Sequence, residues 1–304
     1  MNLDKALMAL RSILLKDQIL TNESMKKHTS FRIGGPADLL VMPNEINQVQ
    51  AVIDVFAQHN IPYIIMGNGS NLLVRDKGIR GGVIKLAEKF SKIEVSNESM
   101  RAQSGILLSA LSNVALRAEL TGLEFASGIP GTLGGAVAMN AGAYDGEMKD
   151  IVDKVIVLDE NSKLQTLSKA DMSFGYRTSA VQGTGKIVLE VYMTAKKGNY
   201  EESKQIIKDL TKRRREKQPL SYPSAGSTFK RPVGYYAGKL IQDSGLRGMR
   251  VGNAQISDLH SGFIVNMGNA TAQDVIELIE RAKLQVYDKF GVELEPELKV
   301  VGEE

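Results

Sequence analysis

The feature that most constrains the fold is a run of glycine and other small residues from Thr121 to Ala143, TGLEFASGIPGTLGGAVAMNAGA. This run contains six glycines and has no charged residue after Glu124. Few side chains stand in the way of such a backbone, so its N–H groups can approach an anion such as a phosphate or pyrophosphate. A tightly packed turn between two buried elements would need the same residues. Glycine content alone therefore leaves both interpretations open.

A second glycine loop, Gly67–Asn71, directly follows the apolar run Ile61–Met66, which predicts a buried strand. Neither loop fits a common nucleotide motif. The dinucleotide fingerprint would need glycine in place of Leu72, and neither loop contains the Gly-Lys-Ser/Thr sequence of a Walker loop. Two polar, glycine-containing loops in one region favour phosphate binding over plain turns.

Composition excludes several classes of function. The chain has 304 residues, of which 43% are hydrophobic and 24% charged, as is typical of a globular chain with two or three domains. A net charge of +3 is too small to indicate a nucleic-acid partner. The chain lacks cysteine and has three widely spaced histidines, so we expect neither disulfides nor a metal site. No segment approaches the ~20 apolar residues of a membrane helix, and the N-terminus does not read as a signal peptide. We therefore expect a cytoplasmic protein without a membrane partner.

Periodicity predicts a mixed order of helices and strands. The final segment, Val292–Val300, alternates apolar and acidic residues and predicts an edge or hairpin strand. The basic run Lys212–Lys217 is interpreted as a solvated helix end, with anion binding as the alternative. Helices are predicted over residues 3–18, 44–56, 106–120, 200–217, 236–243 and 271–290, and strands over 37–42, 61–66, 82–86, 92–95, 100–104, 151–158, 187–191 and 262–266.

Five motifs occur in a fixed order along the chain: GNGSNLLV, GIPGTLGGAVAMNAGAY, FGYRTS, YPSAGSTFKRP and LEPELKVVG. Together they resemble the UDP-N-acetylenolpyruvoylglucosamine reductases, the FAD enzymes that make UDP-N-acetylmuramate for bacterial peptidoglycan. The resemblance extends from about Thr29 to Gly302. The segment after FGYRTS is short, which resembles the shorter form of the family that lacks an extra tyrosine-bearing insertion.

The resemblance implies an α+β fold. Residues 1–199 would form the two-subdomain FAD-binding fold of the vanillyl-alcohol-oxidase (PCMH) type, divided near residues 80–100, with an N-terminal helix over 1–20. Residues 200–304 would form an α+β substrate-binding domain. A monomer is expected.

The implied reaction is the NADPH-dependent reduction of UDP-N-acetylglucosamine enolpyruvate. NADPH would reduce FAD, flavin N5 would deliver hydride to C3, and Ser227 would give a proton to C2. Arg177, in FGYRTS, would bind the substrate carboxylate as charge develops, and Glu297, in LEPELKV, would support the intermediate. On pattern alone Arg177 would be a structural salt bridge, Ser227 a turn residue and Glu297 part of a solvated strand edge.

The resemblance also assigns binding residues. Lys217, Arg247 and Tyr144 would contact the substrate, and His260 would lie near the nucleotide or be structural. The FAD ligands would be Gly67, Asn68, Gly69, Ser70, Asn71, Ser127, Gly128, Ile129, Gly131, Gly134, Gly135, Asn140, Gly142 and Ala143.

Two other functions stay open from the residues. Another flavin-dependent oxidase or dehydrogenase of the same FAD fold would keep the glycine loops but would have no need for SAGSTFK and LEPEL. A non-catalytic sugar-nucleotide-binding protein would bind UDP-sugars without flavin.

Overall fold

The computed structural model describes residues 1–304. The chain forms two compact units, and each is assembled from separated segments. Unit 1 comprises residues 1–20, 39–68 and 81–214, and unit 2 comprises 21–38, 69–80 and 215–304. The division into domains at residues 199 and 200 stays a prediction, because compact units and family domains need not share boundaries.

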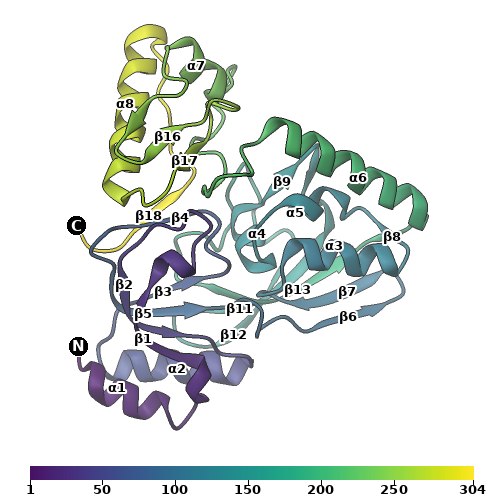
Figure 1. Ribbon diagram of the computed structural model, residues 1–304. Coiled ribbons are helices and arrows are strands. Elements are labelled where there is room, and N and C mark those ends of the chain that lie inside the picture. Colours follow the sequence, from purple (N-terminus) through teal and green to yellow (C-terminus); the bar gives the residue numbers. More distant parts are fainter. The chain divides into compact units, whose positions relative to one another are not determined.

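Helices and strands are interspersed along the whole chain (Figure 1). None of the helices is both long and apolar enough to cross a membrane. The α-helices are α1 (Leu3–Leu10), α2 (Ile46–Gln58), α3 (Leu108–Arg117), α4 (Leu133–Met139), α5 (Met148–Ile151), α6 (Tyr200–Lys217), α7 (Ala237–Asp243) and α8 (Ala272–Phe290). The strands are β1 (Ile19–Ser24), β2 (Pro36–Val41), β3 (Tyr63–Met66), β4 (Leu72–Val74), β5 (Ile79–Lys85), β6 (Ile93–Ser96), β7 (Ser99–Gln103), β8 (Leu120–Thr121), β9 (Gly142–Ala143), β10 (Gly146–Glu147), β11 (Val152–Leu158), β12 (Leu164–Ser168), β13 (Ile187–Thr194), β14 (Lys196–Lys197), β15 (Arg250–Val251), β16 (Ala254–Ile256), β17 (Ile264–Asn266) and β18 (Lys299–Val301).

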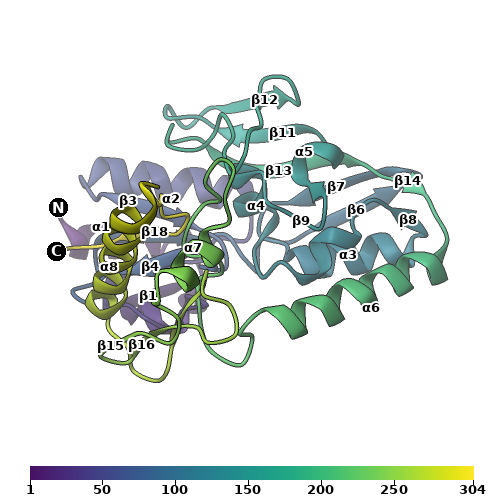
Figure 2. The same cartoon turned by 90° about the horizontal axis from the view of Figure 1, so that it is seen from above.

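Unit 1 is organised by an antiparallel sheet in the order β12-β11-β13-β7-β6. Helices α3, α4 and α5 cover one face of it (Figures 1 and 2). Leu108, Leu133 and Val137 from these helices are buried against Val155 and Val191 of the sheet. Helices α1 and α2 belong to a separate apolar cluster. Burial of the α3 and α4 faces fixes the glycine-rich segment between them on this sheet.

Unit 2 is built around helix α8 and the antiparallel sheet β15-β16-β17 (Figure 1). Thr271 caps α8 as the sequence predicts, because its side chain accepts a hydrogen bond from the N–H of Asp274 at 3.1 Å. One sheet face, including Ile256 and Ile264, is buried in a core with Val275 of α8. The other face is left for the pocket described below.

Three sequence expectations are wrong. Helix α1 ends at Leu10 instead of continuing to residue 18, because the chain turns and the buried Gln18 side chain accepts the N–H of Leu15 at 2.8 Å. Strand β3 is at a sheet edge, in the order β1-β2-β5-β3, so its Tyr63 is 37% exposed and the strand is not buried. The final segment forms a strand only at β18, which pairs in parallel with β4.

Candidate functional site

Within unit 1, the first two residues of the first glycine loop, Gly67 and Asn68, meet the second glycine loop. The Asn68 amide donates to the carbonyl of Pro130 at 2.9 Å, and a Cβ on Gly67 would lie 2.0 Å from the Thr132 Oγ1. Gly67 is therefore required for the loops to approach. The main-chain N–H groups of Asn68, Gly131 and Thr132 have no hydrogen-bond partner within the protein. Unpaired N–H groups from converging loops suit an anionic ligand.

Packing within the protein accounts for some of the other glycines. A Cβ on Gly134 would lie 2.7 Å from the Ser104 Cβ, and one on Gly142 would lie 2.6 Å from the Glu147 Cγ. At Gly135 the nearest atom, the Thr132 Oγ1, would be 3.7 Å away. The segment is thus tightly packed on one side, as the turn interpretation requires, and free of crowding at Gly135.

Arg214 lies against this segment and was missed by the sequence reasoning. Its Nη1 is 3.0 Å from where a Cβ on Gly128 would stand. Burial lowers the pKa of the Arg214 guanidinium, and the nearby Tyr144 opposes that shift. No carboxylate pairs with this half-buried cation within the protein. A half-buried cation without an anionic partner in the protein suits an anionic ligand.

The spacing of residues along α6 could have indicated that Arg214 lies on the buried face of the helix. Along α6, Ser203 is buried, and Ile207, Leu210 and Arg214 are half-buried. The basic residues on either side of Arg214, namely Lys212, Arg213 and Arg215, are exposed. Positions 203, 207, 210 and 214 share one helix face. The basic run is therefore solvated, as interpreted from the sequence, except at Arg214.

Arg177 lies in a closed turn of unit 1. Gly175 and Thr178 exchange two main-chain hydrogen bonds, of 3.1 and 3.4 Å, which leave Tyr176 and Arg177 at the tip. Arg177 has φ +55, and its Nη2 donates to the carbonyl of Gly142 at 3.2 Å. The guanidinium carbon also lies 5.1 Å from the centre of the Tyr176 ring. The hydrogen bond to Gly142 thus connects Arg177 with the end of the glycine-rich segment.

Ser227 and Glu297 lie on neighbouring segments of unit 2. The N–H of Glu297 donates to the carbonyl of Thr228 at 2.8 Å, and Phe229 forms a bridge with Pro296. Asn71, from the first glycine loop, donates to the Glu297 carbonyl at 3.0 Å. Ser227 is exposed and Glu297 half-buried. The structure therefore brings together two of the three predicted catalytic residues.

Glu295 differs from Glu297 in its surroundings. Its carboxylate pairs with the ammonium of Lys230 at 2.5 Å and is largely exposed. Glu295 is therefore a neutralised surface group. Arg177 belongs to unit 1 and Ser227 and Glu297 to unit 2, so the convergence of all three stays a prediction.

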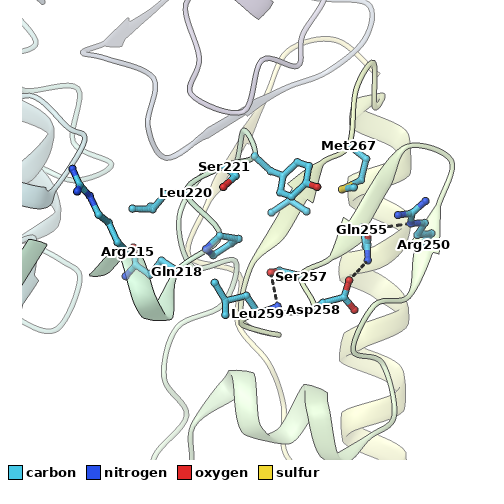
Figure 3. Close-up of a pocket in the computed structure, with 13 residues that line it drawn as sticks. Arg215, Gln218, Leu220, Ser221, Arg250, Gln255, Ser257, Asp258, Leu259 and Met267 are labelled. Carbon is cyan, nitrogen blue, oxygen red and sulfur yellow. Dashed lines mark hydrogen bonds between the residues drawn. The ribbon is translucent and has the colours of Figure 1, made fainter. Parts of the chain in front are cut away.

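A pocket of about 550 Å³ lies on the uncovered face of the unit 2 sheet (Figure 3). Arg250, Gln255 and Val265 stand opposite one another across the three strands and line it. Gln255 accepts from the Arg250 Nε at 3.0 Å and donates to Asp258 at 2.7 Å. On another wall, the Oε1 of Gln218 is buried without a hydrogen-bond partner. Gln218 therefore leaves a buried acceptor beside the pocket that no group in the protein satisfies.

Two of the expected substrate residues border this pocket. Lys217 is exposed and directly precedes Gln218, and the Arg247 Nε donates to the carbonyl of Asp258 at 2.5 Å. Tyr144, the third, is 41% exposed in unit 1 with φ +51. His260 is half-buried, and its Nδ1 accepts the N–H of Gly262 at 3.1 Å. Burial lowers the pKa of His260.

Comparison with known proteins identifies the family. The UDP-N-acetylenolpyruvoylglucosamine reductase of Alkaliphilus oremlandii is 55% identical to this chain over 300 residues, 99% of each protein. This chain belongs to the UDP-N-acetylenolpyruvoylglucosamine reductase family. The reductase of Clostridioides difficile is 53% identical over 295 residues, 97% of each protein. A solved reductase from Thermus caldophilus superposes with a TM-score of 0.79 at 37% identity, covering 93% of this chain and 97% of that one.

Matches to sequence families agree with this assignment. An FAD binding domain matches residues 37–168, and the C-terminal domain of UDP-N-acetylenolpyruvoylglucosamine reductase matches residues 218–301. The resemblance and the expected α+β fold, an FAD-binding domain followed by the reductase C-terminal domain, are therefore confirmed. The individual site residues stay predictions.

Proposed function

We propose that this protein uses NADPH and bound FAD to reduce UDP-N-acetylglucosamine enolpyruvate to UDP-N-acetylmuramate for peptidoglycan synthesis. Family membership over almost the whole chain supports the reaction. One structural observation carries the proposal: the second glycine loop meets Gly67 and Asn68 of the first, and at Gly128 it packs against Arg214, a half-buried cation with no anionic partner in the protein. A cofactor with a pyrophosphate is the kind of ligand that this arrangement requires.

The FAD would be held by both glycine loops. Asn68, Gly131 and Thr132 would donate their unpaired N–H groups, and Arg214 would supply positive charge. The remaining loop residues expected from the sequence, from Gly67–Asn71 and 127–143, would line the same site, except Asn140, whose side chain is enclosed by the protein. FAD bound there would supply the hydride chemistry between NADPH and the enolpyruvyl group.

Arg177 would bind the carboxylate of the enolpyruvyl group. A planar guanidinium forms two parallel hydrogen bonds to a carboxylate, and its charge stabilises the negative charge that builds up next to C2 as hydride reaches C3. The closed turn and the bond to Gly142 fix the direction of this side chain before substrate binds. A group oriented in advance adds little reorganisation cost to the reaction.

Ser227 would donate the proton that C2 takes up. A serine hydroxyl is a weak acid, but a carbanion stabilised as an enolate is a strong base, so the transfer is feasible. Its exposure leaves the hydroxyl accessible to substrate. Glu297, on the adjacent segment, would support the same intermediate through a hydrogen bond. The main-chain bond between Thr228 and Glu297 fixes these two residues relative to each other.

The pocket of unit 2 suits the nucleotide part of the substrate. Lys217 and Arg247 at its border supply positive charge for the diphosphate. Tyr222 and Met267 line the pocket and supply apolar surface for the uracil ring. NADPH and the nucleotide substrate are intracellular metabolites, so we also propose a cytoplasmic location. A monomer is proposed, and light scattering of the purified protein tests it.

Purified protein should be yellow and should release FAD on denaturation. It should oxidise NADPH steadily only after UDP-N-acetylglucosamine enolpyruvate is added, with UDP-N-acetylmuramate as product. Colourless protein that still binds UDP-sugars would support a non-catalytic binding protein. Turnover with simple alcohols, and none with the enolpyruvate, would support an oxidase or dehydrogenase instead. Either result would contradict the proposed function.

A further inference from the structure

Asn140 is the most completely enclosed polar side chain near Arg177. It caps the C-terminus of α4 with φ 45 and ψ 53 and is 0% exposed. Its Oδ1 accepts the N–H of Lys149 at 2.9 Å. Its Nδ2 donates to the carbonyl of Gly175 and to the Glu147 carboxylate, both at 3.0 Å. Both donors and the oxygen of the amide therefore have partners within the protein, and the side chain is enclosed.

The bond to Gly175 connects Asn140 with the Arg177 turn. Gly175 forms one side of the closed turn whose tip is Arg177. A second bond fixes the other side, because the buried Ser179 Oγ donates to the carbonyl of Ala138 at 2.8 Å. Both anchors, Ala138 and Asn140, belong to the C-terminal end of α4 and its cap. The position of the turn thus depends on this end of α4.

Glu147 adds charge to the same cluster. Its Oε2 accepts from the Asn140 amide and lies 2.7 Å from the Lys149 ammonium. The hydrogen bond from Lys149, followed by that from Asn140 and the charge of Arg177, lowers the pKa of Glu147 although burial opposes the shift. Glu147 is therefore ionised at neutral pH, and Asn140 fixes its carboxylate near the Arg177 guanidinium.

A simple capping role does not explain these contacts. Asparagine tolerates the left-handed conformation that ends a helix, and glycine serves that purpose equally well. A cap needs no amide that bridges two other segments. The side-chain bonds of Asn140 to Gly175 and Glu147 are thus additional to the cap, and both lead to Arg177.

We infer that Asn140 is a positioning residue that holds the Arg177 turn, and through Glu147 its guanidinium, in the orientation that the reaction needs. The inference rests on the proposed function, since it assumes that Arg177 binds the substrate carboxylate. It also gives Asn140 a role other than the direct cofactor contact expected from the sequence. The C-terminal end of α4 then orients Arg177, while the loop preceding α4 belongs to the cofactor site.

Asn140→Gly tests this directly, because it keeps the left-handed backbone accessible and removes only the amide. Asn97→Gly is the matched control: Asn97 also has positive φ (52) but lies exposed in the turn between β6 and β7. We expect both variants to bind FAD and to be reduced by NADPH as the wild type is. Flavin reoxidation by substrate, followed in a stopped-flow instrument, should slow by about 10²-fold in Asn140→Gly, the loss typical of a misplaced reacting group. Asn97→Gly should not slow.

A second variant separates this positioning role from a merely structural one. In an Arg177→Ala background, Asn140→Gly should cause no further loss of reoxidation rate, because its effect passes through Arg177. An additive loss, or equal slowing of both half-reactions in the single variant, would overturn the inference. If Asn140→Gly does not fold, Asn140→Asp keeps the size and the acceptor to Lys149 while removing both donors, and the same outcomes apply. If Arg177→Ala alone leaves reoxidation unchanged, the proposed function of Arg177 is wrong, which is a separate result.

Discussion

The Arg177 turn and the segment carrying Ser227 are built by different means. The turn is anchored to α4 by side chains, namely the amide of Asn140 and the hydroxyl of Ser179. Ser227 lies on a segment that main-chain bonds connect to its neighbours, from Thr228 to the carbonyl of Gly262 and from Glu297 to that of Thr228. Main-chain bonds do not depend on side-chain identity. Substitutions near Ser227 should therefore separate chemistry from architecture, whereas those around Arg177 should affect both.

Among substitutions in unit 1, Arg177→Ala is expected to have the largest effect. Loss of the guanidinium removes its stabilisation of the developing charge, so flavin reoxidation by substrate should fall by about 10²–10³-fold. FAD content and flavin reduction by NADPH should change little. Stopped-flow absorbance measures both half-reactions. Arg117→Ala, at the exposed end of α3, is the control, and an equal rate in the two variants would contradict the role of Arg177.

Arg214→Met tests whether unit 1 supplies charge to the cofactor. Hydrogen bonds to charged groups contribute about 1.5–3 kcal/mol, so FAD should bind about 10–150-fold more weakly. Flavin fluorescence during titration of the FAD-free protein gives the affinity. Arg213→Met, the exposed neighbour on α6, should bind FAD as the wild type does. Equal weakening in both variants would mean that only the general charge of the helix matters.

Thr228→Val, next to Ser227, should lower the stability of the fold without removing a catalytic group. The Thr228 Oγ1 accepts the N–H of Ile264 at 3.1 Å in a fully buried position. Valine leaves that N–H unsatisfied, so the free energy of unfolding should fall by about 1–3 kcal/mol. Urea unfolding measures this loss. Reoxidation by substrate should change little, since the main-chain bonds of residue 228 are retained. A large loss of rate with unchanged stability would show that the segment is not fixed by its main chain.

Glu124→Gln is expected to have the smallest effect and to depend on pH. Burial raises the pKa of Glu124, but hydrogen bonds from Ser203, Thr121 and Gly122 outweigh it, so the pKa lies below its ordinary value. A lowered carboxyl pKa stabilises the fold above the unfolded-state pKa of about 4.3, and that stability is lost as pH falls through the folded-state pKa. Urea unfolding should therefore show the wild type more stable than the variant near neutral pH, with the difference shrinking in acid. A difference that is constant with pH would contradict this.

Local signals in the sequence were sufficient for some elements. Helix α8 has its cap at Thr271 and a continuous apolar face, so its type and start follow from spacing alone. Helix α6 likewise runs over the predicted residues, Tyr200–Lys217. The sequence also indicated the two glycine loops. It did not indicate that the Asn68 side chain would donate to the carbonyl of Pro130, 62 positions away.

Pairings between distant segments were beyond sequence reasoning. Strand β18 pairs with β4, and nothing in the alternation of Val292–Val300 indicates that partner. Pro296 has no N–H to offer a strand ladder, which is one reason why the predicted long strand is absent. The burial of Arg214 and the bonds of Asn140 likewise depend on segments that are brought together only by the fold.

Ser227→Ala separates proton donation from hydride transfer, because both half-reactions can be followed in one sample. Flavin reduction by NADPH should proceed as in the wild type, and reoxidation by UDP-N-acetylglucosamine enolpyruvate should be slower by about 10²–10⁴-fold, the usual contribution of a positioned proton donor. Equal slowing of the two half-reactions, or no slowing of reoxidation, would show that Ser227 is not the proton donor.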